Sequence, residues 1–89
     1  EKIMPVYEVL LSKTARKQLA VLPVFIHNKI IEDISHLSSV PRPIGCKKLK
    51  GYNNSYRIRV TDYRIIYEIE DKILRVLIVA IGHRKNIYE

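Results

Sequence analysis

Three arginines on two neighbouring predicted strands are the residues of this chain best suited to chemistry. Residues 56–64, YRIRVTDYR, alternate with a period of two, which places Arg57 and Arg59 on one face of a strand. A short turn then brings Arg64 directly opposite Arg59. Like charges in this arrangement disfavour a hairpin by roughly 0.2–1 kcal/mol. We therefore interpret this face as an anion-binding surface, although an ordinary solvated sheet face has the same pattern.

A second group of reactive side chains follows the last predicted strand. Gly82 allows the backbone to turn and delivers His83, Arg84 and Tyr88 near the sheet end that carries Arg64. Guanidinium groups bind phosphate oxygens in a bidentate manner, so we expect Arg64 and Arg84 to stabilise negative charge. An imidazole, with an ordinary pKa of about 6.5, is suited to general acid or base catalysis. The alternatives are that His83 only hydrogen-bonds at a strand end and that Tyr88 only packs the C-terminus.

The charge of the chain supports an anionic partner. The net charge is +7 and the isoelectric point about 9.7. Residues 1–41 carry five Lys/Arg against four Asp/Glu, whereas residues 42–89 carry eleven against five. The basic half contains a lysine cluster, which we expect to bind backbone phosphates together with Arg57 and Arg59, unless it is simply solvated. Its members are Lys47, Lys48 and Lys50.

Several classes of protein are disfavoured by composition. Cys46 is the single cysteine, so neither an internal disulfide nor a cysteine-based metal site is expected. Asp62 and Glu68 are the only acids near the basic face, which argues against a two-metal nuclease. We expect no cofactor and no metal. The longest apolar run, residues 76–82, is too short to span a membrane, and no leader precedes the first strand, so we expect a cytoplasmic protein without a membrane partner.

The order of elements predicts an α+β fold of the form β-α-α-β-β-β. A strand at 6–11 precedes a helix that starts at Ser12 or Thr14, and a second helix starts at Pro23. A loop at 38–46 leads to the arginine hairpin, and a tight turn at 70–72 leads to the last strand at 73–81. We expect a helix hairpin on one face of a four-stranded, mainly antiparallel sheet. The whole chain, 1–89, is predicted to form one domain, with residues 1–4 as a tail.

The hydrophobic pattern also predicts how the strands pair. Ile58 should lie opposite Ile65 in the first hairpin. In the second, the tight turn predicts Ile65 opposite Ile78, Glu68 opposite Arg75 and Arg64 opposite Val79. One sheet face is then apolar across three strands, and the helices should cover it.

The chain resembles the RelE/ParE superfamily of bacterial toxins over nearly its whole length, from about Val6. The resemblance lies in the order of elements and in four motifs in sequence. These are Lys48-Leu49-Lys50-Gly51, Tyr56-Arg57-Ile58-Arg59-Val60, Asp62-Tyr63-Arg64-Ile65-Ile66-Tyr67, and Gly82-His83-Arg84 followed by Ile87-Tyr88.

The resemblance implies a toxin of a type II toxin–antitoxin pair. Members of the RelE branch are ribonucleases that cut messenger RNA, typically at the ribosome, and an acidic RelB-like antitoxin neutralises them. The positions matching that active site are Arg57, Arg59, Arg64, Arg84 and Tyr88, and His83 matches members with a histidine there. We therefore expect a metal-independent endoribonuclease in which the 2′-hydroxyl attacks the phosphodiester. The spacing from Arg84 to Tyr88 is shorter than in some members, which leaves the role of the phenol open.

Two other functions are compatible with a basic domain of this kind. The ParE branch keeps the fold without the cutting residues and inhibits DNA gyrase; His83, Arg84 and Tyr88 speak against it. The other is a basic nucleic-acid-binding module without chemistry. An adjacent reading frame for a short acidic protein would favour a toxin over such a module.

Overall fold

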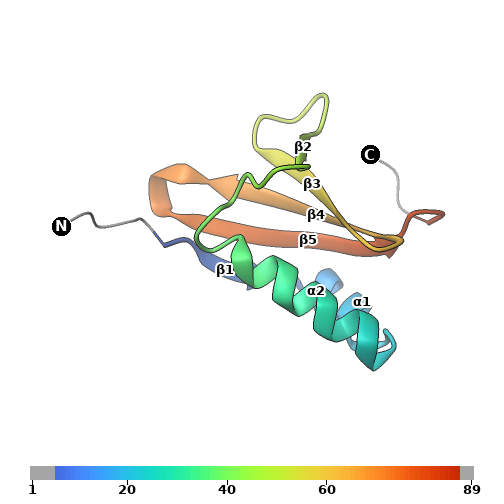
Figure 1. Cartoon of the computed structure of the whole chain (residues 1–89). Coiled ribbons are helices and arrows are strands. Elements are labelled where there is room, and N and C mark those ends of the chain that lie inside the picture. Colours follow the sequence, from blue (N-terminus) through green and yellow to red (C-terminus); the bar gives the residue numbers. More distant parts are fainter. Residues whose placement is uncertain (1–5, 87–89) are drawn as a thin grey trace.

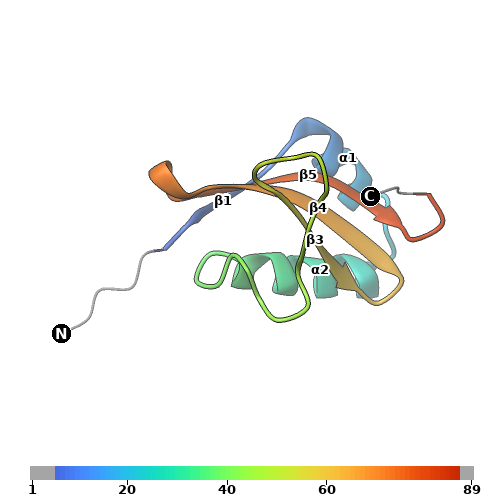
Figure 2. The same cartoon turned by 90° about the horizontal axis from the view of Figure 1, so that it is seen from above.

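The computed structural model describes residues 6–86, which form a mixed five-stranded sheet with both helices on one face (Figures 1 and 2). The strand order is β1-β5-β4-β3-β2, with β1 parallel to β5 and the other pairs antiparallel. Within the described part, no helix is long and apolar enough to cross a membrane. The elements are β1 (Glu8–Leu11), α1 (Lys13–Ala20), α2 (Val24–His36), β2 (Lys47–Lys48), β3 (Ser55–Val60), β4 (Tyr63–Glu70), a 3₁₀ turn (Asp71–Ile73) and β5 (Arg75–His83).

The predicted α+β architecture is confirmed, but the sheet has a fifth strand. The two residues of β2 pair with β3 as Lys47↔Arg57 and Lys48↔Tyr56. A two-residue strand is too short to show a hydrophobic period, so sequence patterns could not reveal it. Its consequence is that the lysine cluster runs along the edge of the arginine hairpin.

Both helices form where the sequence predicts them. The Ser12 hydroxyl caps α1 by accepting a hydrogen bond from the Ala15 N–H at 3.0 Å. Pro23 lies directly before α2, where its missing N–H costs nothing. The chain reverses between the helices, and α1 packs on β5 and β1 while α2 packs on β3 (Figure 2). Their buried residues are Ala15, Leu19, Ile30, Ile34 and, just after α2, Leu37.

The helix-facing side of the sheet forms the core. Its buried apolar side chains lie on the three central strands and meet those of the two helices in one cluster. They are Ile58, Val60, Ile65, Tyr67, Ile69, Val76, Ile78 and Ile81. Because strand side chains alternate, this burial turns the intervening residues of β3 and β4 away from the helices. That outer face carries the arginines.

The register of the first hairpin is confirmed, whereas that of the second is wrong. Ile58 pairs with Ile65 and Arg59 with Arg64. In the second hairpin Ile65 pairs with Ile81 instead of Ile78, and Arg64 pairs with Gly82 instead of Val79. The connection is longer than predicted because a 3₁₀ turn precedes β5, and the register slips by one further residue at a β-bulge beside Ile66 and Tyr67.

The pairing of Glu68 with Arg75, predicted from that register, is also wrong. Arg75 lies opposite Glu70 and not Glu68. Its Nε atom is 3.7 Å from Oε1 of Glu8 on the parallel strand β1, between two largely exposed side chains. Glu68 faces Ser55 of β3 and Leu77 of β5 instead.

Thr61 adopts an unfavourable backbone conformation at the tip of the arginine hairpin. Its φ is +54°, a value that a β-branched residue rarely adopts. A two-residue hairpin turn normally has glycine at such a position. Strain of this kind costs about 1–3 kcal/mol.

We expect Thr61→Gly to stabilise the protein, because it removes this strain and adds only about 0.4–1 kcal/mol of unfolded-state entropy. The free energy of unfolding should rise by about 1 kcal/mol, which corresponds to about 4–8 °C in melting temperature for a domain of this size. Thermal melts followed by circular dichroism measure it. A lower melting temperature for Thr61→Gly than for the wild type would contradict the assignment of strain, and Thr61→Ala, which keeps a Cβ, should gain less.

Candidate active site

Arg59 and Arg64 are brought as close together as two facing strand residues can be. In a two-residue hairpin the residues flanking the turn, here Val60 and Tyr63, form the hydrogen-bonded pair. Arg59 and Arg64 are then a non-hydrogen-bonded pair, whose Cα atoms are only about 4.5 Å apart. Arg59 is exposed, Arg64 is half-buried, and Arg57 is only 4% exposed. The predicted concentration of positive charge on one face is therefore present.

Three arginines line a small pocket beside the hairpin turn. It has a volume of about 140 Å³ and is lined by Arg59, Thr61, Asp62, Tyr63, Arg64 and Arg84. We call it the three-arginine pocket. Arg84 is fixed there by its backbone N–H, which donates to the Asp62 carbonyl at 2.8 Å. Its Nε is 4.0 Å from Asp62 Oδ1, but both side chains are exposed, so this ion pair holds the guanidinium only weakly.

The three-arginine pocket is suited to hold a phosphate. Several cations within one small space favour the charge that accumulates on a phosphodiester as it reacts. A guanidinium keeps its proton in proteins, so these groups supply charge and hydrogen bonds and not proton transfer. The sequence prediction that Arg64 and Arg84 lie at the same site agrees with this geometry.

His83 is not brought into the three-arginine pocket. It pairs with Tyr63, and its ring meets the Tyr63 ring edge-on, with centroids 5.4 Å apart. It lines a separate cavity of about 340 Å³ at the end of α1, with Gln18 and Leu22 among its neighbours. The Lys85 N–H donates to Nδ1 at 3.2 Å, so the neutral ring carries its proton on Nε2.

Tyr88, the fourth predicted catalytic residue, lies outside the described residues. Among residues 6–86, no group of three or more His, Cys, Asp or Glu side chains is placed to hold a metal ion.

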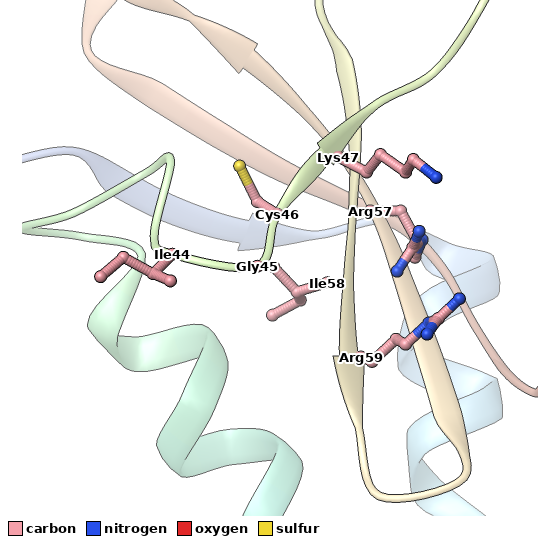
Figure 3. A pocket seen from close by; sticks show the side chains of 7 residues that line it. All are labelled: Ile44, Gly45, Cys46, Lys47, Arg57, Ile58 and Arg59. Atoms are coloured by element: carbon pink, nitrogen blue, oxygen red, sulfur yellow. The ribbon is translucent and has the colours of Figure 1, made fainter.

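The predicted substrate-binding residues form a basic strip beside the three-arginine pocket. Lys47, Arg57 and Arg59 extend from β2 and β3 to the same side and line a cavity of about 520 Å³ (Figure 3). Lys48 and Lys50 continue the strip along the sheet edge, where they line a further cavity of about 250 Å³. The strip and the pocket share Arg59, so a polyanion can contact both at once.

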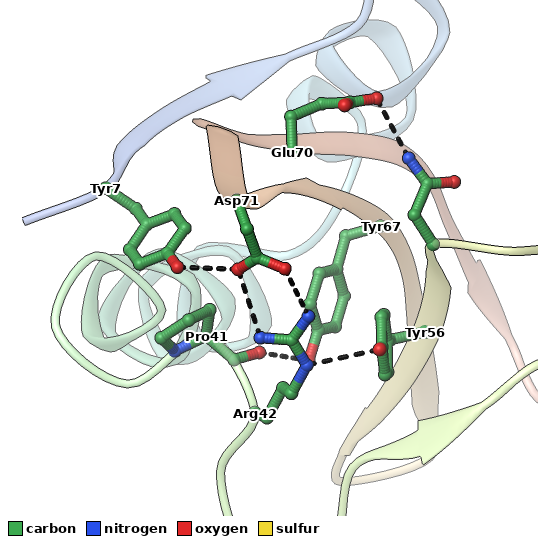
Figure 4. A network of polar contacts seen from close by, with 8 residues as sticks. Tyr7, Pro41, Arg42, Tyr56, Tyr67, Glu70 and Asp71 are labelled. Atoms are coloured by element: carbon green, nitrogen blue, oxygen red, sulfur yellow. Dashed lines mark hydrogen bonds and ion pairs between the residues drawn. The ribbon is translucent and has the colours of Figure 1, made fainter. Parts of the chain in front are cut away.

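A polar network at the other end of the sheet was not found from the sequence. Arg42, in the loop after α2, donates from Nη2 to Asp71 Oδ2 at 2.8 Å and from Nε to the Tyr56 hydroxyl at 3.1 Å (Figure 4). The Tyr7 hydroxyl donates to Asp71 Oδ1 at 2.6 Å. We call Tyr7, Arg42, Tyr56 and Asp71 the loop clamp. Nothing in the local pattern of residues 38–46 indicates that Arg42 reaches across to a turn 29 residues away.

The loop clamp rests on two stacked tyrosines. The rings of Tyr56 and Tyr67 lie 6.0 Å apart, and the Arg42 guanidinium lies 5.1 Å from the centre of the Tyr56 ring. The Tyr67 hydroxyl donates to the Pro41 carbonyl at 2.8 Å. Burial raises the pKa of Tyr67 well above its usual range, and the nearby Cys46 thiol raises it further. The loop that carries Ile44 and Cys46 to the basic strip is thus anchored to the core.

The fold and the three-arginine pocket define a small basic domain that presents a cluster of arginines on the outer face of its sheet. The family described as the ParE toxin of the type II toxin–antitoxin system matches residues 9–88. Toxin RelE3 of Methanocaldococcus jannaschii is 37% identical over 86 residues, covering 92% of this chain and 96% of that protein. Toxin RelG of Mycobacterium tuberculosis is 31% identical over 83 residues, covering 92% and 95%.

Solved structures give the same result. The archaeal RelE–RelB complex of Pyrococcus horikoshii matches with a TM-score of 0.81 at 29% identity, covering 92% of this chain and 99% of that one. The toxin–antitoxin complex RelBE2 of Mycobacterium tuberculosis matches with a TM-score of 0.80 at 30% identity, covering 97% and 100%. The chain belongs to the RelE/ParE family of type II toxin–antitoxin toxins, and within it to the RelE type.

The loop clamp predicts a specific loss of stability in acid. Hydrogen bonds from Arg42 and then Tyr7 lower the pKa of Asp71 from 3.8 to about 2. Because the folded pKa is depressed, the stabilisation is present above pH 3.8 and is lost as the pH falls through about 2. Asp71→Asn should melt below the wild type near neutral pH, and the difference should shrink from about pH 4 and be mostly lost near pH 2.

Thermal melts of both proteins across this pH range measure the effect. Glu32→Gln, on the exposed side of α2, is the control and should follow the wild type. A constant difference between Asp71→Asn and the wild type down to pH 2 would contradict the role of the carboxylate charge.

Proposed function

We propose that this protein is a metal-independent endoribonuclease that cuts messenger RNA at the ribosome and so inhibits translation. The observation that carries the proposal is the three-arginine pocket, where Arg59, Arg64 and Arg84 meet from β3, β4 and the segment after β5. The RelE-type relatives support it, as does the basic strip that leads away from the pocket.

The proposed reaction uses the RNA's own nucleophile. The 2′-hydroxyl oxygen attacks the adjacent phosphorus and loses its proton to a base, while the bond from phosphorus to the 5′-oxygen breaks and that oxygen takes a proton from an acid. The products are a 2′,3′-cyclic phosphate and a 5′-hydroxyl. Arg64, the half-buried member of the facing pair, and Arg84 stabilise the extra charge on the phosphorane-like transition state. Arg57, Arg59 and the lysine cluster bind the flanking phosphates.

We propose His83 as a proton carrier of this reaction, and Tyr88 as the residue that orients the 2′-hydroxyl or stacks on a base. The Lys85 N–H occupies Nδ1, the nitrogen of the neutral His83 ring that can accept a proton, so this hydrogen bond has to break when the ring acts as a base. His83 would have to act from the Tyr63 side of the sheet end, next to Arg84 in the chain. A glutamine at position 83, which cannot titrate, should remove the corresponding limb from the pH–rate profile if this role is right.

The second candidate is inhibition of DNA gyrase, because the matching family is described by its ParE member. A gyrase inhibitor needs only a surface that binds gyrase, and it has no use for a pocket of positive charge around a phosphorus atom. It would leave transcripts intact and cause DNA damage.

We expect Arg64→Ala to reduce messenger cleavage by about 10²–10³-fold, since it removes one fixed donor of transition-state charge. Cleavage is measured by mapping 5′-hydroxyl ends on ribosome-bound messenger RNA, with growth inhibition as a second readout. Arg75→Ala, at the opposite end of β5, is the control and should cut normally. A transcript with a 2′-deoxynucleotide at the cut site should resist, and chelation of metal ions should have no effect. Wild-type cleavage by Arg64→Ala would refute the assignment.

We also infer a cognate acidic antitoxin that resembles RelB. The solved relatives from Pyrococcus horikoshii and Mycobacterium tuberculosis are toxin–antitoxin complexes. The net charge of +7 and the exposed lysines of β2 fit an acidic partner that covers the basic strip.

Antitoxin affinity should therefore fall with salt, because exposed charge pairs are screened as the Debye length shrinks from about 10 Å at 0.1 M to about 3 Å at 1 M. Isothermal titration with the acidic protein encoded next to the toxin gene measures the slope. Arg59→Ala should flatten it, whereas Lys72→Ala, in the turn before β5, should not. A salt-independent affinity would show that apolar contacts alone hold the complex.

A further inference from the structure

A large cavity lies at a gap in the sheet edge. It has a volume of about 520 Å³, within the range of about 300–1,000 Å³ typical of ligand pockets. The loop residues Ile44, Gly45 and Cys46 form one wall, and Arg57, Ile58 and Arg59 of β3 form another, with Lys47 at the rim. It adjoins the three-arginine pocket, because Arg59 lines both. We call it the edge cavity.

The gap arises because β2 ends before β3 does. The register between them covers only Lys47↔Arg57 and Lys48↔Tyr56. In an antiparallel strand, the backbone groups of successive residues point alternately to the two neighbouring strands. The even-numbered residues of β3 point theirs towards β4, as the hydrogen bond of 2.9 Å from the Ile69 N–H to the Asn54 carbonyl indicates. The odd-numbered ones point outwards, as in the bond from the Leu49 N–H to the Ser55 carbonyl. At Arg59, an outward N–H and C=O therefore face the edge cavity.

The two sides of the edge cavity differ in chemistry. Ile44 and Ile58 extend to one side of β3, whereas Lys47, Arg57 and Arg59 extend to the other (Figure 3). The Ile44 side chain is fully exposed on its loop, and Gly45 turns the chain with a φ of +94°. The apolar side continues into a smaller cavity of about 190 Å³, which shares Ile44, Ile58 and Arg59 and reaches Leu37, Val40 and Pro43.

We propose that the edge cavity binds the base of the RNA nucleotide next to the cleaved phosphodiester, and so sets a base preference at that position. This inference rests on the proposed function. The face of the base packs against Ile44 and Ile58, and its edge bonds with the outward N–H and C=O of Arg59. The nucleotide's phosphates lie on the cationic side. Unstacked bases in single-stranded RNA are recognised in this way, by packing on side chains and by hydrogen bonds to their edges.

An added peptide strand is the competing occupant, and the geometry disfavours it. Val60 bonds with Tyr63 and Ile58 with Ile65, so Arg59 is the only residue of β3 beyond the end of β2 with outward backbone groups. A peptide would gain about two ladder hydrogen bonds, far short of a normal strand of about five residues. A base edge needs no more than one donor and one acceptor. The three cations lining the same cavity also favour a phosphate-bearing ligand.

The test compares base preference in cleavage between Ile44 variants. Messenger RNA with randomised codons is cut on the ribosome, and the 5′-hydroxyl ends are sequenced. For Ile44→Ala we expect the discrimination between bases at one position beside the cut to fall about fivefold or more. Ile44→Phe should keep or sharpen the preference, because a flat ring offers a larger stacking surface. Ile73→Ala, an equally simple truncation of an exposed isoleucine in the turn before β5, is the matched control and should cut like the wild type.

A second measurement does not depend on cleavage. The Arg64→Ala protein is titrated with the four nucleoside monophosphates, and backbone amide shifts are followed by NMR. We expect the largest shifts at Gly45, Cys46 and Arg59, with a different dissociation constant for at least one base. Ile44→Ala should weaken this binding.

The outcomes separate the two proposals. Base preferences that are identical in the wild type, Ile44→Ala and Ile44→Phe would overturn the edge cavity as a base site while leaving the ribonuclease intact. The same result together with weaker antitoxin binding by Ile44→Ala would assign the cavity to a peptide. A wild-type protein that cuts no RNA would overturn the proposed function, and absence of amide shifts in the edge cavity would then overturn the base site independently.

Discussion

Burial of one sheet face under two helices is the constraint on which the rest of the structure depends. Side chains in a strand alternate, so the burial of Ile58, Val60 and Ile65 forces Arg59 and Arg64 onto the outer face. The repulsion between facing arginines costs at most about 1 kcal/mol. Burying three large aliphatic side chains contributes about 1.5–3 kcal/mol each. The free energy gained by burying the core is therefore several times larger than the repulsion between the arginines. The core alone is enough to hold Arg59 and Arg64 side by side.

The first hairpin shows that features set by local geometry can be predicted from the sequence. Its turn has two residues, and its strands have a strict period of two, so one register satisfies both. Arg59 facing Arg64 followed directly from these two facts. The Ser12 cap and the buried stripe of Ile30 and Ile34 were equally accessible, because capping and helical spacing are local properties.

Features that depend on distant contacts could not be predicted in this way. The strand at Lys47–Lys48 exists only because β3 lies beside it. The bond between Arg42 and Asp71 joins two segments whose separation in space is set by the whole fold. The edge cavity depends on both, since β2 begins only after the loop has turned at Gly45, and the loop clamp holds that loop against the sheet. A site made from the gaps between elements leaves no periodic trace in the sequence.

The β-bulge decides which side chains meet at the end of the sheet that carries Arg64. Before it, Ile69 pairs with Val76 and Tyr67 with Ile78; after it, the register has slipped by one residue, so that Arg64 pairs with Gly82. A slip of one residue moves every following side chain of β5 to the other face. Without it, His83 would lie on the face of Arg64. With it, His83 packs against Tyr63, and the chain continues to place Arg84 in the three-arginine pocket. One extra residue in one strand thus places a permanent cation, and not an imidazole, in the three-arginine pocket.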